Sequence, residues 1–313
     1  MNKIFLFCFA ALLLSPVALA VELAPAKLMA SYWVDHSEGL DISGLSFCNN
    51  QLLAVSDKNS EEIYLLKLDS DKAELVPYLQ LADLGAPEQN PDSWWLAIVE
   101  WFRPDDALDF EGITCAGGSI YVVSEHYNRI IRIGQGGKAE WHQYLWSPAA
   151  KLQGYLQKPN ASSEGLVAAG DEFWVAMERE PRGLLRLSAA GEAEVFPVPL
   201  VGGLDFRRDS KDVAGLDYHD GALFTLERNA SAVCRRTLPS LEAEWCLTYR
   251  AIEESPEYVY QETRYGKGEG LAVSDAGIFV VLDNNNVGRD QSPEDRRALL
   301  LHLAMPADTD KLN

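Results

Sequence analysis

The stretch DFEGITCAGGSIYVVSEHYN, residues 109–128, places a Glu-Gly pair at the start of one apolar run and a second glutamate at the end of the next. The glycines at 117 and 118 separate the two runs, which is typical of a β-hairpin with a tight turn. A hairpin does not need a carboxylate at each end in order to fold. Glu111 and Glu125 are therefore candidates for a function.

The same pattern occurs five times along the chain. Each copy has a glycine followed by an apolar residue, a turn rich in Asn, Gly or Asp, an apolar run, and an acidic residue. The glycines are Gly44, Gly112, Gly165, Gly215 and Gly270, and the acids are Asp57, Glu125, Glu178, Glu227 and Asp283. Glycine and acid are thirteen residues apart in four copies and twelve in the copy of Gly215. Such self-similarity indicates a repeat fold.

Further strand-like runs follow each acid, such as residues 129–134, 183–188 and 298–303, and then 139–146 and 193–200. Four short strands that recur about every fifty residues are the signature of β-propeller blades. We therefore predict an all-β, five-bladed β-propeller. The last copy lacks a fourth strand, so residues 27–35 are expected to close the ring by completing the last blade. A sixth, degenerate blade in residues 84–108 stays open, although PDSWWLAIVEWF (91–102) looks more helical than stranded.

Residues 1–20 are predicted to be a signal peptide, because Lys3 precedes a short apolar run and Ala18-Leu19-Ala20 fits a cleavage site. Residues 21–313 are then a single propeller domain, which we expect in the periplasm or outside the cell. No other stretch is long and apolar enough to span a membrane. The net charge of −20 argues against nucleic acid or an anionic membrane as a partner. It fits a solvated acidic surface as well as a cation site.

Four cysteines follow the apolar start: Cys48, Cys115, Cys234 and Cys246. In an exported protein they are expected to form disulfides, for which three connectivities exist. Cys234 and Cys246 flank a turn between two strands, so they are the preferred pair. Cys48 and Cys115 occupy similar places in successive copies and would join neighbouring units.

The two strands of each hairpin are antiparallel, so the residue before the glycine and the acid lie at the same mouth of the channel. The inner positions are Ser43, Glu111, Glu164, Ala214 and Glu269. Glutamates that converge on one axis repel each other unless they take up protons or a cation neutralises them. An all-oxygen set suits Ca²⁺ better than Mg²⁺. The alternative is a ring of solvated carboxylates in a wet channel.

The Glu-Gly-Leu/Ile motif with its acidic strand end resembles the phytase-like family ("esterase-like activity of phytase") and the related SdiA-regulated propellers. The order Ser, Glu, Glu, small residue, Glu is also similar to the calcium-activated nucleotidase propellers, in which serine and glutamates of successive blades hold a central calcium. The resemblance implies Ca²⁺ as the cofactor, with Ser43, Glu111, Glu164 and Glu269 as its ligands. Ala214 departs from the pattern.

Next to the acids lie Lys58, His126, Arg179 and Arg228. One hypothesis is a Ca²⁺-dependent hydrolase of a small anionic ester, in which Lys58, Arg179 and Arg228 bind the anion and Glu125 with His126 is the general base. The structural alternative is salt bridges between blades. A second hypothesis is a non-catalytic envelope propeller with a structural Ca²⁺ and a protein or glycan partner on the loop-rich face. The loops of that face, 82–108, 146–162, 201–212 and 250–267, carry aromatic and basic residues, including Arg207, Arg208, Arg264 and Lys267.

Overall fold

The structure, a computed structural model, describes residues 21–306 apart from residues 83, 86, 88–107, 158–161 and 180. The predicted signal peptide at residues 1–20 lies outside the described residues. So do the tryptophan-rich segment 91–102 and most of the stretch that was left open as a sixth blade.

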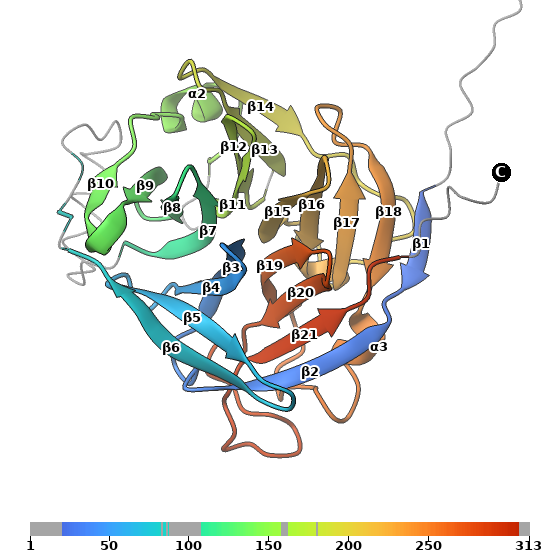
Figure 1. The fold of residues 1–313 in the computed structure, drawn as a ribbon. Coiled ribbons are helices and arrows are strands. Elements are labelled where there is room, and N and C mark those ends of the chain that lie inside the picture. Colours follow the sequence, from blue (N-terminus) through green and yellow to red (C-terminus); the bar gives the residue numbers. More distant parts are fainter. Residues whose placement is uncertain are drawn as a thin grey trace, which may run out of the picture.

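Antiparallel sheets stand around a central channel, and the first strand of each sequence copy lies nearest the axis (Figure 1). These inner strands are β3 (Ile42–Cys48), β7 (Phe110–Ala116), β11 (Ser163–Ala169), β15 (Gly215–His219) and β19 (Gly268–Ser274). The second strands are β4 (Gln51–Ser56), β8 (Ser119–Ser124), β12 (Glu172–Met177), β16 (Ala222–Glu227) and β20 (Gly277–Leu282). The third strands are β5 (Glu62–Leu68), β9 (Arg129–Ile133), β13 (Gly183–Leu187), β17 (Ala232–Arg236) and β21 (Leu299–Leu303). The prediction of an all-β propeller is confirmed.

The outermost strands complete the sheets. They are β6 (Ala73–Gln80), β10 (Ala139–Trp141), β14 (Ala193–Pro197) and β18 (Ala243–Thr248). The sheet of β19, β20 and β21 receives β2 (Leu28–Asp35), which pairs antiparallel with β21 as the sequence predicted. The end of β2 also pairs in parallel with β6, so these two sheets merge into one of eight strands. The parallel addition of β1 (Glu22–Pro25) to β18 was not foreseen.

The motif glycines allow the inner strands to converge. A Cβ on Gly112 would lie 2.5 Å from the backbone nitrogen of Leu166, and one on Gly165 would lie 2.7 Å from that of Leu216. Each motif glycine packs against the inner strand of the next copy in this way, and Gly270 packs against Leu45 of the first copy. Any side chain at these positions would force the strands apart, so the ring of backbone contacts depends on glycine.

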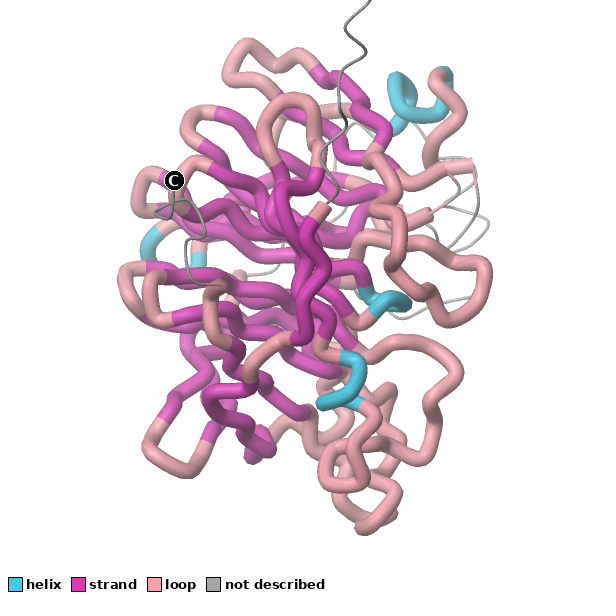
Figure 2. The backbone as a smooth tube through the Cα atoms, turned by 90° about the vertical axis from the view of Figure 1, so that its right-hand side faces the viewer, coloured by secondary structure: helices cyan, strands magenta, loops and turns pink. Residues whose placement is uncertain are grey.

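The hydrophobic core lies between neighbouring sheets. One cluster joins the first and second copies through buried residues such as Val55, Ile113 and Val122, and another joins the second and third copies through Val123, Leu166 and others. Helical segments are short and belong to the connections: α2 (Ser147–Leu152), α3 (Arg250–Glu253), η1 (Gln135–Gly137) and η2 (Arg228–Ala230). Figure 2 shows the longer loops mainly on one side of the sheets.

No helix in the described part of the chain has the length and apolar character needed to cross a membrane.

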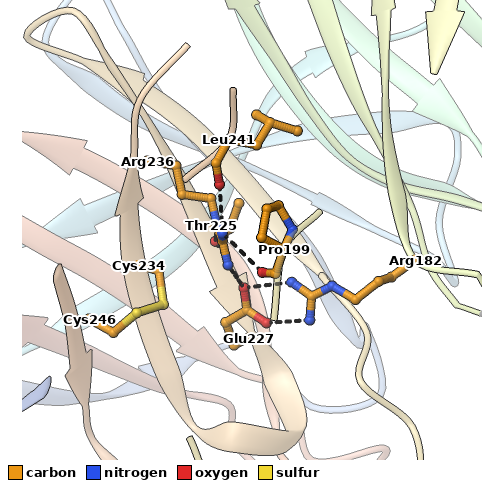
Figure 3. Close-up of a disulfide and its surroundings, with 8 residues drawn as sticks. All are labelled: Arg182, Pro199, Thr225, Glu227, Cys234, Arg236, Leu241 and Cys246. Atoms are coloured by element: carbon orange, nitrogen blue, oxygen red, sulfur yellow. Dashed lines mark hydrogen bonds and ion pairs between the residues drawn. A yellow bond between two sulfur atoms is a disulfide. The ribbon is translucent and has the colours of Figure 1, made fainter. Parts of the chain in front are cut away.

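Both expected disulfides are present. Cys48–Cys115 joins the end of β3 to the end of β7, so it links two neighbouring sheets across 67 residues of sequence. Cys234–Cys246 joins the adjacent strands β17 and β18 within one sheet (Figure 3).

Candidate metal centre at the mouth of the channel

The inner-position side chains reach the axis because their strands are bulged. The register of β3, β7 and β19 shifts at Ser43, Glu111 and Glu269, and that of β11 shifts between Ser163 and Leu166. An extra residue in one strand bends the strand and re-aims a side chain. Ser43, Glu111 and Glu269 consequently line a narrow cavity on the axis, together with the five motif glycines.

The fourth copy differs in the placement of its charges. The motif glycine pairs with Val55, Val123 and Val281 in three copies, and the acid lies two residues further on. Gly215 pairs with Leu226, so the corresponding residue two positions later is Arg228. An arginine therefore stands where the other copies have an acid, and Ala214 stands at the inner position.

The expectation that Glu227 belongs to the ring of acids at the mouth is wrong. Because successive residues of a strand face opposite sides, the twelve-residue spacing turns Glu227 away from the mouth. Its buried carboxylate accepts hydrogen bonds from Arg182 at 2.8 and 3.0 Å and from Arg236 at 2.8 Å (Figure 3). Burial opposes ionisation, but the two arginines hold the pKa of Glu227 below its ordinary value.

Arg228 lies among four carboxylates. Its Nη1 donates to both carboxylate oxygens of Glu269 at 2.7 and 2.9 Å. Its Nη2 donates to Glu178 at 2.8 Å, and its Nε donates to Asp212 at 2.8 Å. Glu164 lies 3.8 Å from Nη1. We call Arg228 and these four carboxylates the arginine half of the mouth.

Burial is the largest influence on the pKa values of Glu164 and Glu269 in the arginine half. It raises the pKa of Glu269 to about 7 and that of Glu164 well above its ordinary value, although Arg228 acts in the opposite direction on both. Burial also opposes the charge of Arg228, but the surrounding carboxylates, Glu269 first, raise its pKa well above the ordinary value. One guanidinium is thus shared by more carboxylates than it can neutralise.

On the other side of the mouth, oxygens of Asp57, Asp109 and Glu111 lie within 4.8 Å of one another. We call these three residues the acidic half. Burial, followed by repulsion from Glu164, raises the pKa of Glu111 well above its ordinary value. Burial likewise raises the pKa of Asp57 to about 6. Lys58 approaches only from the rim, 2.6 Å from Asp57, with 54% of its side chain exposed.

Two oxygens near the acidic half lack a hydrogen bond. Oδ1 of Asp57 and Oδ1 of Asp41 are buried and have no partner within the described ranges. A buried polar atom without a partner costs free energy, on the order of 1–3 kcal/mol. These oxygens, the carboxylate-only donor set and the excess of negative charge all fit a hard divalent cation such as Ca²⁺.

The sequence reasoning missed Asp41 and Asp109. Both stand three residues before a motif glycine, as Asp212 does in the fourth copy, so this recurrence was the available signal. Asp41 and Asp109 have left-handed backbones with φ of 45° and 56°, which aspartate tolerates better than most residues. Their carbonyls accept the backbone N–H of Asp57 and Glu125, which holds the start of the inner strand beside the end of the second.

The four ligands that the resemblance implied are divided between the halves. Glu111 belongs to the acidic half, whereas Glu164 and Glu269 face Arg228. Ser43 lines the axis and donates its hydroxyl hydrogen to the backbone carbonyl of Phe110. Lone pairs of Glu269 that a metal would use already accept hydrogen bonds from Arg228. The set of Ser43, Glu111, Glu164 and Glu269 therefore stays a prediction.

The residues predicted to act in catalysis are at the rim. Burial, and then repulsion from Asp109, raises the pKa of Glu125 to about 8, so its carboxyl holds a proton at neutral pH and is suited to donate it. The ring of His126 packs edge-on against Tyr127 at 4.5 Å. Arg179 pairs with Glu178 at 2.7 Å and keeps 34% of its side chain exposed. Arg228, in contrast, uses every guanidinium nitrogen on carboxylates.

Comparison with solved structures supports the fold. Glutaminyl cyclase from Myxococcus xanthus aligns over 92% of this chain and 100% of its own, with a TM-score of 0.56 and 11% identity. The PQQ-bound aldose sugar dehydrogenase from Streptomyces coelicolor aligns over 89% of this chain and 98% of its own, with a TM-score of 0.47 and 12% identity. At 11% identity, the likeness to the glutaminyl cyclase shows the fold alone.

A comparison with curated proteins gives no significant match. A family model described as "Phytase-like: Esterase-like activity of phytase" matches residues 39–180, which include the first three Gly motifs. The resemblance to the phytase-like family that the Glu-Gly motif predicted is therefore confirmed over this part of the chain.

Proposed function

We propose that this chain is an exported, five-bladed, calcium-binding propeller of the phytase-like type, and that it hydrolyses small anionic esters. The observation that carries the proposal is the acidic half, where oxygens of three carboxylates from two neighbouring copies lie within 4.8 Å of one another. The count of five blades is supported by the glycine contacts, which lead from each copy to the next and return to the first. Export is supported by the two disulfides.

The rim residues have separable tasks in this proposal. Asp57, Asp109 and Glu111 would hold the calcium, which when bound supplies a Lewis acid for the ester. Lys58 and Arg179 keep exposed side chains beside the carboxylates and would bind the anionic group. Glu125, which interacts with Asp109 at the rim, would give a proton to the departing oxygen. Arg228 is not assigned to the anion, because it already serves four carboxylates.

The test begins with metal binding. Purified protein is stripped with EDTA, and its thermal midpoint and metal content are measured as Ca²⁺ is added. A single site at a hundredfold excess over Kd stabilises the folded state by about 2.7 kcal/mol. We expect this gain in wild type and its loss in Glu111→Gln and Asp109→Asn.

Glu269→Gln and Ser43→Ala are the matched comparisons. If the metal lies in the acidic half, both variants keep most of the calcium response. If Glu269→Gln and Ser43→Ala abolish it as completely as Glu111→Gln, the metal lies on the axis, as the resemblance first implied. A wild-type protein that binds no calcium and does not respond to it contradicts the proposal.

Hydrolysis is then assayed with phosphate and carboxylate esters in the calcium-loaded protein. Inactivity of a protein that binds calcium would favour the second hypothesis, an envelope binding propeller with a structural ion. That alternative is favoured by one observation: the cations at the rim are few, and Arg228 is unavailable to a ligand.

A further inference from the structure

Two loops that precede the inner strands β15 and β19 carry a pair of exposed arginines. The guanidinium carbons of Arg208 and Arg264 lie 5.7 and 5.2 Å from the centre of the same ring, that of Tyr265. This ring is 40% exposed. Within the part of the chain that the structure describes, neither guanidinium forms a hydrogen bond or an ion pair.

This arrangement is unusual for so acidic a chain. Other arginines of the described residues, such as Arg132 and Arg186, pair with a neighbouring glutamate at 2.7 Å. The acid nearest Arg264 in sequence, Glu262, accepts a hydrogen bond from Lys267 at 2.9 Å and one from the backbone N–H of Arg264, but none from the guanidinium of Arg264. Glu262 offsets the charge of Arg264 only from a distance, so two like charges that share one ring repel each other, and a bound anion would reduce that repulsion.

The loops are held firmly to the mouth. Asn229, which follows Arg228, accepts the backbone N–H of Arg207 at 2.7 Å and, through its side chain, that of Gly266 at 3.0 Å. Its side-chain amide also donates to Asp212 of the arginine half at 2.8 Å. The positions of Arg208 and Tyr265 are therefore fixed by residues adjacent to them rather than by contacts of their own side chains.

The backbone at Arg208 is in the left-handed region, with φ of 66°. This conformation is unfavourable for a residue with a β-carbon. The preceding Arg207 is anchored at 2.9 Å to the buried Glu253 and at 2.8 Å to Glu254. The turn thus directs one arginine inward to a structural role and leaves the next one exposed over Tyr265.

We propose that Arg208, Arg264 and Tyr265 form a binding site for the phosphoryl group of a soluble phosphate ester. Guanidinium groups match phosphate oxygens with paired N–H donors, and the exposed tyrosine ring offers a face for the organic part of the ligand. The inference goes beyond the proposed function, because anion binding here requires neither calcium nor hydrolysis.

The experiment measures binding of phenyl phosphate and of inorganic phosphate by calorimetry, in EDTA. We expect phenyl phosphate to bind more tightly than phosphate. Arg208→Ala/Arg264→Ala should weaken both by about tenfold or more, the effect of losing at least one charged hydrogen bond. Tyr265→Leu should weaken phenyl phosphate alone.

Arg186→Ala is the matched control, since Arg186 also lies over an aromatic ring, 5.3 Å from the centre of Phe196, but is paired with Glu194. It should leave both affinities unchanged. Arg208→Lys/Arg264→Lys keeps the charge without the paired donors and should fall between wild type and the alanine variant. The thermal midpoints of the lysine and alanine variants show whether a loss of binding comes from a loss of the fold.

Several outcomes would overturn the assignment. They are the absence of phenyl phosphate binding in EDTA, binding that appears only with calcium, and binding that the arginine variants do not change. Vesicles containing phosphatidic acid form a separate arm, because their headgroup offers the same chemistry. Binding to these vesicles without binding to phenyl phosphate would show that the site takes a lipid headgroup and would also overturn it. Failure of the calcium test leaves this assay unaffected.

Discussion

The two halves of the mouth handle the same surplus of carboxylates in different ways. In the arginine half, Arg228 supplies a buried cation that hydrogen-bonds to Glu178, Asp212 and Glu269. In the acidic half, Lys58 pairs with Asp57 but is more than half exposed, and Oδ1 of Asp57 is buried without a hydrogen bond among the described residues. The sequence pattern presents five similar acidic positions around the mouth. Because the fourth copy has Arg228 where the second has Glu125, the carboxylates fall into two groups with different surroundings.

The halves also differ in what joins their sheets. Copies one and two are linked by the disulfide Cys48–Cys115, whereas Arg228 and the pair Arg182–Glu227 link copies three, four and five through ion pairs. A covalent bond does not need to outweigh the desolvation of charges, but a buried ion pair does. The sheets of the acidic half therefore remain joined by a covalent bond, without a buried arginine of the kind that links copies three, four and five.

The largest expected effect comes from removing the buried cation. Arg228→Met should lower the free energy of unfolding by about 5 kcal/mol, because four buried carboxylates lose the cation that they share, and only Glu178 and Asp212 keep another partner. Urea unfolding at pH 7 in EDTA measures the loss. Lys58→Met is the control, and an exposed pair of this kind should cost less than about 1 kcal/mol. Equal losses in the two variants would show that the halves are electrostatically alike.

Adding Glu269→Gln to Arg228→Met should recover part of the loss, since one of the carboxylates left behind becomes neutral. The double variant also separates charge from packing. If it is no more stable than Arg228→Met alone, the guanidinium acts by filling space rather than by neutralising its neighbours.

The next effect concerns the disulfides. Cys48→Ala/Cys115→Ala should destabilise the protein by about 4 kcal/mol, because the closed loop is long, and Cys234→Ala/Cys246→Ala by about 3 kcal/mol, because the loop of 12 residues is short. Guanidinium unfolding of the two variants gives the comparison. The reverse order would mean that the contacts between the first two sheets hold them together without the covalent link.

The smallest expected effect is the pH dependence of stability that Asp217 causes. This buried carboxylate has no cation among the causes of its pKa shift, so it serves as a reference for the acidic half. Burial raises its pKa to about 7, against about 4 in an unfolded chain. Between these values the folded protein keeps a proton that the unfolded chain has lost, so the free energy of unfolding falls as the pH rises. We expect a loss of about 2 kcal/mol between pH 5 and pH 8 from this group, measured as the difference between wild type and variant.

Asp217→Thr is the matched variant, because the second copy has Thr114 at the same position. Thr114 accepts a backbone N–H from the next inner strand at 3.1 Å, just as Asp217 accepts that of Val273. The replacement keeps an acceptor and removes the charge. If wild type and Asp217→Thr lose stability in parallel as the pH rises, Asp217 is ionised throughout and is no model for the acidic half.

The repeat, and with it the propeller and the closing N-terminal strand, could be predicted from the sequence alone, which also favoured the pairing Cys234–Cys246 among three possible connectivities. These features depend on spacing along the chain: alternation within strands, turn residues between them, and glycines where strands converge. The addition of β1 to β18 could not be read in this way, because a four-residue edge strand carries no pattern of its own.

How the charged side chains meet depends on contacts between copies that are far apart in sequence. Asp57, Asp109 and Glu111 come from two copies, and the carboxylates around Arg228 come from three, so none of these sets is continuous in sequence. The spacing of twelve residues between Gly215 and Glu227 can be read from the sequence, but the direction in which the Glu227 side chain points cannot. In a strand, a shift of one residue exchanges the two faces, and this exchange buried Glu227 between Arg182 and Arg236 and placed Arg228 at the mouth.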